Sequence, residues 1–350
     1  MNMNTYSIIP PDSRLKERIQ QQIDNLNKPL GALGRLEEIA LQICLIQQTC
    51  HPTLQHPCHV LFAADHGIER EGVSASPREI TWQQMINFTR GGGGVNMFCR
   101  QHGFELHLVD VGVDYDLSDF PKIIDRKIAR GTRNFLHEAA MSEEEMERAL
   151  QTGTEMTDRC RKNGCNIICF GEMGIGNTSP SAIWLHLLGE HPLEECIGCG
   201  SGLNQEGVSH KYKVLSAAVN RFRQKYPAPT PEEIIRYFGG FEMVATVGAM
   251  LRAAELGMII LVDGFIMSAC MLAACRLYPA TREYALFGHE GEERGHRLLL
   301  ADLHAHGLLQ LGFRLGEGTG ALCAYPIIES AVRMMNEMNT FDESHITKYF

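Results

Sequence analysis

The chain has 350 residues, of which 44% are hydrophobic and 21% are charged, and its 32 Lys and Arg against 42 Asp and Glu give a formal net charge of −10. This composition is typical of a globular protein with one large domain or two smaller ones. A net acidic chain argues against binding to nucleic acid or to an anionic membrane surface, because both need a dense basic face. No apolar run reaches the roughly 18 residues of a membrane span, and the first residues lack the pattern of a secretory signal. We therefore expect a cytoplasmic protein.

Twelve cysteines and fifteen histidines raise the question of metal binding. One Cys-x-x-Cys pair occurs, Cys196 and Cys199, but neither a second pair nor two closely spaced histidines follow it at zinc-site spacing. His289 and His296 are too far apart in sequence to lie on neighbouring turns of one helix. Several other cysteines lie inside apolar runs, where a free thiol behaves as a small buried hydrophobic group. We predict no metal and no other cofactor.

Both ends of the chain have a helical pattern. Charged and apolar residues recur at spacings of three and four over residues 12–49, with one break at a proline and two glycines, and residues 321–341 form an amphipathic segment. Neither end carries a strand signal. We therefore expect a small helical domain from residues 1–50 plus 320–350, beside a large α/β domain over residues 51–319.

Four short apolar runs alternate with segments of helical spacing in the middle of the chain. They lie at residues 59–67, 104–112, 166–174 and 258–265, and each ends in an acid or a glycine at a turn. Continuously apolar strands that alternate with helices are typical of a parallel sheet covered on both faces. The sequence therefore predicts an α/β fold with a parallel, Rossmann-like sheet flanked by helices. In such sheets the ligand lies outside the carboxyl ends of the strands.

Three glycine-rich turns carry polar residues that suit a ligand site. The first, residues 171–178, follows a strand and precedes a helical segment. Its glycines let the backbone approach an anion closely, and the helix start offers free N–H groups to a phosphate. The second, residues 198–202, is followed by Lys211, which could supply a positive charge. The third, residues 315–321, places Glu317 among small residues.

Glu317 and the acids at the strand ends each have two interpretations. A glutamate in a loop is usually just solvated, but glycines flank Glu317 and the segment before it is apolar. A carboxylate partly removed from water has a raised pKa, as a general base working near neutral pH requires. Asp65 and Asp263 could line a site, or they could cap the next helix and bond loop N–H groups.

Two further segments are open to more than one interpretation. Ser74, Ser76 and Gln83 could line a pocket, or residues 76–79 could form an ordinary capping box with proline at its first helical position. Four successive glycines, residues 91–94, are expected to mark a tight turn or a close approach of helices rather than a catalytic element.

Two common nucleotide-binding fingerprints are absent from the sequence. No G-K-[ST] ending of a Walker A motif occurs, which argues against ATP or GTP phosphoryl transfer. The glycines of residues 171–176 have neither the spacing nor the chain position of a dinucleotide fingerprint, which argues against a dehydrogenase. The remaining classes are an enzyme that transfers a phosphoribosyl or nucleoside group and a non-catalytic nucleotide sensor. Glu317 discriminates between them, because only the enzyme needs a base.

Motifs along nearly the whole chain resemble one family. They are FAADHGIEREGVSASPREIT (62–81), NFTRGGGGVN (87–96), GEMGIGNTSPSAI (171–183), LVDGFIMSA (261–269) and LGFRLGEGTGA (311–321). In their order along the chain and in their residues, these motifs are similar to those of the nicotinate-nucleotide–dimethylbenzimidazole phosphoribosyltransferases. The resemblance implies that nicotinate mononucleotide and 5,6-dimethylbenzimidazole react to α-ribazole 5′-phosphate and nicotinate, with inversion at C1′, during assembly of the cobalamin nucleotide loop. It also implies a homodimer.

The resemblance assigns roles to residues at matching motif positions. Glu317 would be the general base on the incoming benzimidazole, and Glu172 a second functional carboxylate on the ribose and nicotinate side. The nucleotide and its phosphate would be held by Gly174, Gly176, Thr178, Gly200, Lys211 and Asp263. The base pocket would be lined by Ser74, Ser76, Gln83 and Leu315. The resemblance leaves the preferred lower-ligand base open.

Overall fold

The computed structural model describes residues 5–348 and is built on one six-stranded sheet. The strands are β1 (Cys58–Ala64), β2 (Glu105–Gly112), β3 (Ile123–Asp125), β4 (Ile167–Met173), β5 (Ile259–Val262) and β6 (Ala285–Phe287). All neighbours pair in parallel, in the order β3-β2-β1-β4-β5-β6. This is the strand order of a Rossmann sheet. The predicted fold class is therefore confirmed.

The four apolar runs found in the sequence are β1, β2, β4 and β5. Every residue of β1 and of β5 is buried, as expected for strands with helices on both faces. The two outer strands, β3 and β6, were not predicted. Each has three residues, too few for a periodic pattern that separates a strand from a loop.

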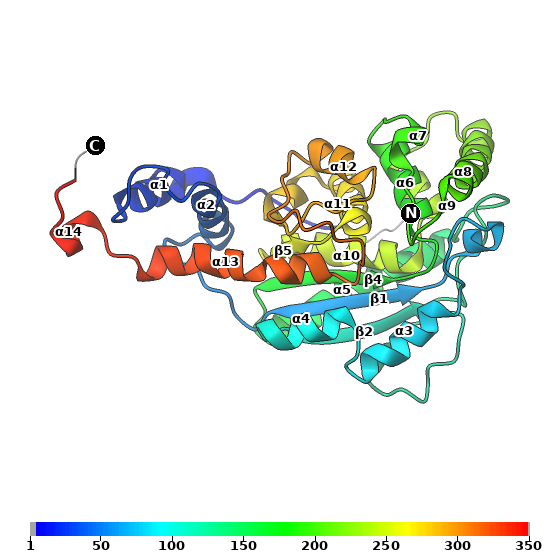
Figure 1. Cartoon of the computed structure of the whole chain (residues 1–350), viewed down its shortest axis with the longest axis horizontal. Coiled ribbons are helices and arrows are strands. Elements are labelled where there is room, and N and C mark those ends of the chain that lie inside the picture. The colour runs from blue at the N-terminus through cyan, green and yellow to red at the C-terminus, as the bar shows by residue number, and fades with distance from the viewer. Residues whose placement is uncertain (1–4, 349–350) are drawn as a thin grey trace.

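Helices cover both faces of the sheet (Figure 1). In chain order they are α1 (Lys16–Asn25), α2 (Arg35–Gln47), α3 (Ile80–Thr89), α4 (Gly94–His102), α5 (Glu143–Lys162), α6 (Thr178–Leu188), α7 (Leu193–Cys196), α8 (Gln205–Lys225), α9 (Pro231–Phe238), α10 (Phe241–Glu255), α11 (Phe265–Leu277), α12 (His296–Asp302), α13 (Thr319–Glu337) and α14 (Phe341–Ser344). Helix α10 packs on the central strands and on α5 and α11, whereas α3, α4 and α13 contact the sheet from the other face.

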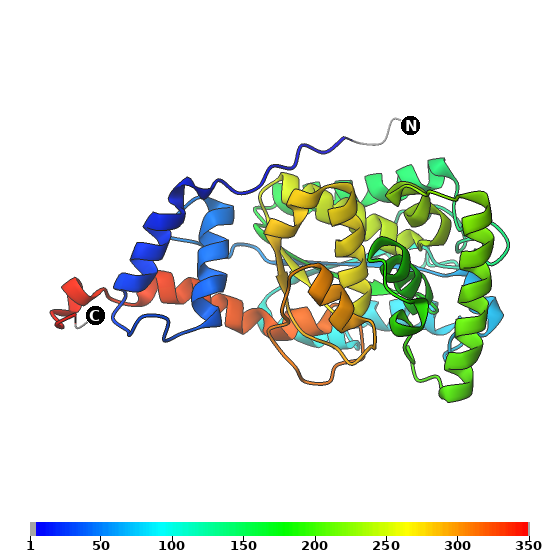
Figure 2. The same cartoon turned by 90° about the horizontal axis from the view of Figure 1, so that it is seen from above.

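Helices from the two chain ends lie together beside the sheet (Figure 2). Helix α1 packs on α2, and α2 packs on α13. The same α13 also contacts α4, β4 and β5, so that one helix joins the terminal helices to the sheet. The division into a helical domain of residues 1–50 plus 320–350 and a large domain of residues 51–319 stays a prediction, to which this packing adds support.

Polar residues gather at the carboxyl edge of the sheet. Asp65 follows β1, Glu172 is the penultimate residue of β4, and Asp263 follows β5. All three are buried. Because β4 lies between β1 and β5 in the sheet, these carboxylates come from adjacent strands of one edge, which is where the sequence predicts a ligand site.

Candidate active site

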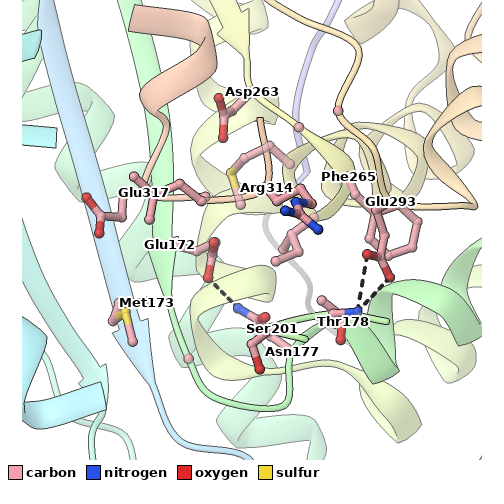
Figure 3. A pocket seen from close by; sticks show the side chains of 18 of the residues that line it. Glu172, Met173, Asn177, Thr178, Ser201, Asp263, Phe265, Glu293, Arg314 and Glu317 are labelled. Carbon is pink, nitrogen blue, oxygen red and sulfur yellow. Dashed lines mark hydrogen bonds between the residues drawn. The ribbon is translucent and has the colours of Figure 1, made fainter. Parts of the chain in front are cut away.

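A cleft with an empty volume of about 1000 Å³ opens at the carboxyl edge of the sheet. All three glycine-rich turns contribute to its walls, together with the start of α11. Figure 3 shows Glu172 and Glu317 on one side of this cleft and Thr178 and Glu293 on the other. The predicted site residues that line the cleft are Ser74, Glu172, Gly174, Gly176, Thr178, Gly200, Asp263, Leu315 and Glu317.

Three predicted site residues lie outside the cleft lining. Lys211, on α8, is buried behind the wall, and its Nζ donates a hydrogen bond of 2.7 Å to Thr178 Oγ1. Ser76 donates its backbone N–H to Ser74 Oγ at 3.2 Å, one step back from the cleft. Gln83, on α3, is exposed. The base-pocket roles of Ser76 and Gln83 therefore stay predictions.

The loop that carries Glu317 is pressed against the sheet. Gly316, Glu317 and Gly318 have φ values of +83°, +62° and +82°, a left-handed conformation that glycine adopts freely and glutamate rarely. A Cβ at Gly318 would lie 2.1 Å from Cε1 of His59, so that only glycine lets the loop pack this closely on β1. Strained residues of this kind cluster at functional sites. The conformation of Glu317 supports a functional role for it.

The carboxylate of Glu317 is buried against the start of α4. Its Oε2 accepts the backbone N–H of Val95 at 3.0 Å. Burial raises the pKa of Glu317, whereas the N–H groups of Val95 and Gly94 lower it by favouring the charged form. A Cβ at Gly94 would lie 2.9 Å from Cδ2 of Leu315, so glycine also makes room here. The four-glycine segment, expected to mark a tight turn or a close approach of helices, leads into a helix start that binds the candidate base.

Glu172 faces the same cleft but has a different partner. Its Oε2 accepts a hydrogen bond from the side-chain amide of Asn177 (Figure 3). Burial raises the pKa of Glu172 to about 8; the bond from Asn177 opposes this rise, and the nearby carboxylates of Glu242, Asp263 and Glu317 add to it. At neutral pH Glu172 is therefore mainly protonated and can donate a hydrogen bond.

A buried acid–imidazole pair supports the turn after β4. His66 Nε2 and Glu242 Oε1 lie 2.6 Å apart. Gly174 covers them, since a Cβ there would come within 3.1 Å of either atom. Sequence analysis did not identify this pair. His66 and Glu242 are 176 positions apart, and only the packing of α10 against β1 brings them together.

Groups suited to an anion meet on the other side of the cleft. Lys211 Nζ, Thr178 Oγ1 and the backbone of Gly200 lie together, since a Cβ at Gly200 would be 3.0 Å from Thr178 Oγ1 and 3.7 Å from Lys211 Nζ. Burial lowers the pKa of Lys211 to about 8, against the opposing charge of Glu293. Both carboxylate oxygens of Glu293 lie 3.3 Å from the Gly200 nitrogen and accept its N–H. A cation and a hydroxyl are typical phosphate ligands, whereas the N–H of Gly200 is bonded to Glu293 in this structure. Glu293 was not predicted as part of the site.

Asp263 binds a histidine and a helix start. Its Oδ1 lies 3.3 Å from Nε2 of His289 and accepts the backbone N–H of Ala321 at 2.9 Å. Burial favours the neutral acid, but these contacts outweigh it and hold the pKa of Asp263 below its ordinary value. His289 and His296 were judged too distant in sequence for neighbouring turns of one helix. Their rings nevertheless meet edge to face, with centroids 5.9 Å apart, because a loop folds back between them. Asp263 thus bonds the start of the distant helix α13 and not that of the next helix, α11, whose start has no side-chain cap. Its nucleotide role stays a prediction.

Comparisons with known proteins agree with this architecture. A family model described as phosphoribosyltransferase matches residues 8–346. Nicotinate-nucleotide–dimethylbenzimidazole phosphoribosyltransferases from Bacteroides fragilis and Phocaeicola vulgatus are 57% and 58% identical to the chain, each over 99% of the chain and 100% of the relative. The crystal structure of the enzyme of that name from Thermus thermophilus superposes with a TM-score of 0.91 at 37% identity, over 97% of this chain and 100% of the other. The chain therefore belongs to the nicotinate-nucleotide–dimethylbenzimidazole phosphoribosyltransferase family.

Proposed function

We propose that this phosphoribosyltransferase transfers the phosphoribosyl group of nicotinate mononucleotide to 5,6-dimethylbenzimidazole, for the lower ligand of cobalamin, with Glu317 as the general base. The family gives the reaction. The observation that supports the base is the position of Glu317, whose buried carboxylate lies on a helix start in a strained loop at the cleft. This placement keeps a proton acceptor near an aromatic substrate while excluding most water.

The chemistry moves the ribose carbon C1′ from one nitrogen to another. In nicotinate mononucleotide, C1′ is bonded to a positively charged pyridinium nitrogen. The electron pair of that bond leaves with nicotinate and neutralises the ring, so the leaving group needs no added acid. One ring nitrogen of dimethylbenzimidazole forms the new bond on the opposite face and inverts C1′. The other ring nitrogen becomes acidic as the bond forms, and its proton goes to Glu317.

Glu172 and the anion-binding groups act on the nucleotide. A protonated Glu172 donates a hydrogen bond to a ribose hydroxyl or to the nicotinate carboxylate, which an ionised Glu172 would repel. Thr178, Gly200 and Lys211 hold the phosphate on the far side of the cleft. Binding energy at the phosphate then positions C1′ between the leaving nicotinate and the incoming base.

The incoming base would lie beside Leu315. This side chain lines the cleft yet is 59% exposed, and an exposed apolar group at a pocket mouth suits an aromatic ligand. Ser74 also lines the cleft, and its hydroxyl could bond a ring nitrogen. Ser76 and Gln83, which lie outside the cleft lining, would support the base pocket without lining it.

The proposal includes a homodimer located in the cytoplasm. Family resemblance supports a homodimer, and light scattering would distinguish twice the mass of one chain from a single chain. Within residues 5–348, no helix has both the length and the apolar character for crossing a lipid bilayer. The acidic composition and the family support a cytoplasmic location.

The test is product formation by the purified full chain. Nicotinate mononucleotide is incubated with dimethylbenzimidazole, benzimidazole, adenine or p-cresol, and the products are identified by mass spectrometry and by the anomeric NMR signal. We expect nicotinate and an α-linked ribotide, with dimethylbenzimidazole preferred. A folded protein that binds nicotinate mononucleotide but forms no product with any base would instead indicate the sensor.

A further inference from the structure

Thiol and imidazole side chains meet beneath the sheet, outside the catalytic cleft. Cys58 is the first residue of β1, His107 lies on β2, and Cys160 lies on α5. All three are buried, and their potential ligand atoms lie within 4.8 Å of one another. We propose that Cys58, His107 and Cys160 bind a structural zinc ion, and that Cys165, which lies outside this group of close ligand atoms, turns toward the ion as the fourth ligand.

The pleat of the sheet separates this cluster from the active site. Cys58 is paired with Glu105, and Val60 with His107, in the parallel register of β1 and β2. Since side chains alternate between faces along a strand, Cys58 and His107 point to the same face. His59 points to the other face, where it touches the loop of Glu317. The cluster therefore lies between the sheet and α5, independent of the chemistry in the cleft.

A third thiol adjoins the cluster. Cys165 lies between α5 and β4, and its thiol adjoins that of Cys58. The Sγ of Cys165 also lies 3.1 Å from the carbonyl oxygen of Ile167. With Cys165 turned toward the ion, three thiols and one imidazole would form the Cys₃His set of structural zinc sites. The spacing along the chain gave no sign of this set, because its members come from two strands, a helix and a loop.

One ring nitrogen of His107 is buried and lacks a hydrogen-bond partner. This atom is Nε2, and the nearest acid, Glu105, has Oε1 at 3.5 Å from it. A buried polar atom without a partner costs free energy. Zinc binds histidine through a ring nitrogen, so an ion in this cluster would give the buried imidazole a partner.

The test is the metal content of the full chain, loaded with Zn²⁺ under reducing conditions, desalted and analysed by plasma mass spectrometry. We expect a stoichiometric amount of zinc in the wild type and loss of most of it in Cys160→Ser. The matched control is Cys44→Ser, which changes a buried cysteine on α2 outside the cluster and should keep the zinc. Stoichiometric zinc in Cys160→Ser would overturn the assignment.

A second measurement needs no variant, so it tests the proposed zinc ligands even if Cys160→Ser does not fold. X-ray absorption of the zinc-loaded wild type should show sulfur ligands at about 2.3 Å and a nitrogen ligand at about 2.0–2.1 Å. A wild type that retains no zinc after desalting would contradict the proposal. So would a disulfide between Cys58 and Cys160 in the native protein, because it would consume two ligands.

Discussion

Glu172 and Glu317 are the same residue type in two turns of one cleft, yet the structure holds them in different ways. Their exposed fractions are 7% and 5%, so burial alone cannot distinguish them. Glu172 is bonded by the neutral amide of Asn177. Glu317 is bonded by the backbone N–H of Val95, at the positive end of α4. The two carboxyl groups therefore differ in the hydrogen-bond donor that each one meets.

One cleft therefore holds two glutamates with different hydrogen-bond donors, a neutral side-chain amide for Glu172 and a helix-start N–H group for Glu317. The pKa of Glu172 rises to about 8, which leaves it mainly protonated at neutral pH. Burial also raises the pKa of Glu317, and the N–H groups at the start of α4 oppose that rise. Pairs of acids whose environments differ in this way mark acid and base assignments in enzymes.

The largest effect on activity is expected from replacing Glu317, the proposed proton acceptor. Glu317→Gln keeps the size and the hydrogen-bonding capacity of the side chain but cannot take a proton, so kcat should fall by about 10²–10⁴-fold. Binding of nicotinate mononucleotide, measured by calorimetry, should not change. Glu329→Gln, on the exposed surface of α13, is the control and should keep full activity. An unimpaired kcat in Glu317→Gln would remove the base assignment.

The next largest effect concerns the opposite side of the cleft. Lys211→Met removes a buried cation, and a charge-assisted hydrogen bond of about 1.5–3 kcal/mol corresponds to roughly a 10–100-fold rise in KM for nicotinate mononucleotide. Because burial lowers the pKa of Lys211 to about 8, the wild-type KM should also rise as the pH passes that value. Steady-state kinetics across pH would measure both.

Lys213→Met is the matched control for this prediction, since Lys213 is exposed two residues further along α8. Its KM should stay at the wild-type value. Equal effects of the two substitutions would show that general charge, and not the position of Lys211, attracts the phosphate.

A smaller effect is expected in the pH dependence of the free energy of unfolding, through Glu172. Unfolded Glu172 loses its proton near the ordinary value of 4.5, whereas the folded protein holds it up to about pH 8. The stability contributed by this group is therefore present below pH 4.5 and is lost as the pH rises to about 8, at up to about 1.4 kcal/mol per pH unit. Glu172→Gln cannot lose a proton, so its free energy of unfolding should decline less over that range.

Denaturant titrations of the wild type and Glu172→Gln at several pH values would show this. The variant should also keep much of its activity at neutral pH, because glutamine can donate a hydrogen bond as protonated Glu172 does. Glu172→Ala, which cannot, should be less active. Parallel stability curves for the wild type and Glu172→Gln would show that Glu172 is ionised in the folded protein.

The smallest effect is expected in the base pocket. Ser74→Ala removes one neutral hydrogen bond of about 0.5–1.5 kcal/mol, which corresponds to roughly a 2–10-fold change in kcat/KM for the incoming base. Gln83→Ala should do less, because Gln83 is exposed and lies outside the cleft lining. Competition between dimethylbenzimidazole and adenine would measure both variants. A larger change in Gln83→Ala would place the base nearer α3.

The sheet could be predicted because its inner strands are long and continuously apolar. The same argument placed Glu172, Asp263 and the glycine turns at the carboxyl edge. Strands β3 and β6 were missed because three residues carry no period. The glycines before α4 were recognised as a close approach, but nothing local to them indicated what they approach.

Contacts between distant loops set the limit of sequence reasoning. Val95 and Glu317 are 222 positions apart, and neither turn carries a local sign of the other. The same holds for His66 with Glu242 and for Glu293 with Gly200, at separations of 176 and 93 positions. These partners are what tune the site, so a residue's presence in the cleft could be predicted while its protonation state could not.

The most direct test of the protonation state of Glu172 is infrared difference spectroscopy of the carboxyl C=O band in the full chain. The structure predicts a band from protonated Glu172 at neutral pH that disappears as the pH rises through about 8. The band should be absent in Glu172→Gln and present in Glu317→Gln. A neutral-pH band that persists in Glu172→Gln but vanishes in Glu317→Gln would reverse the assignments, and no band at all would contradict a protonated Glu172.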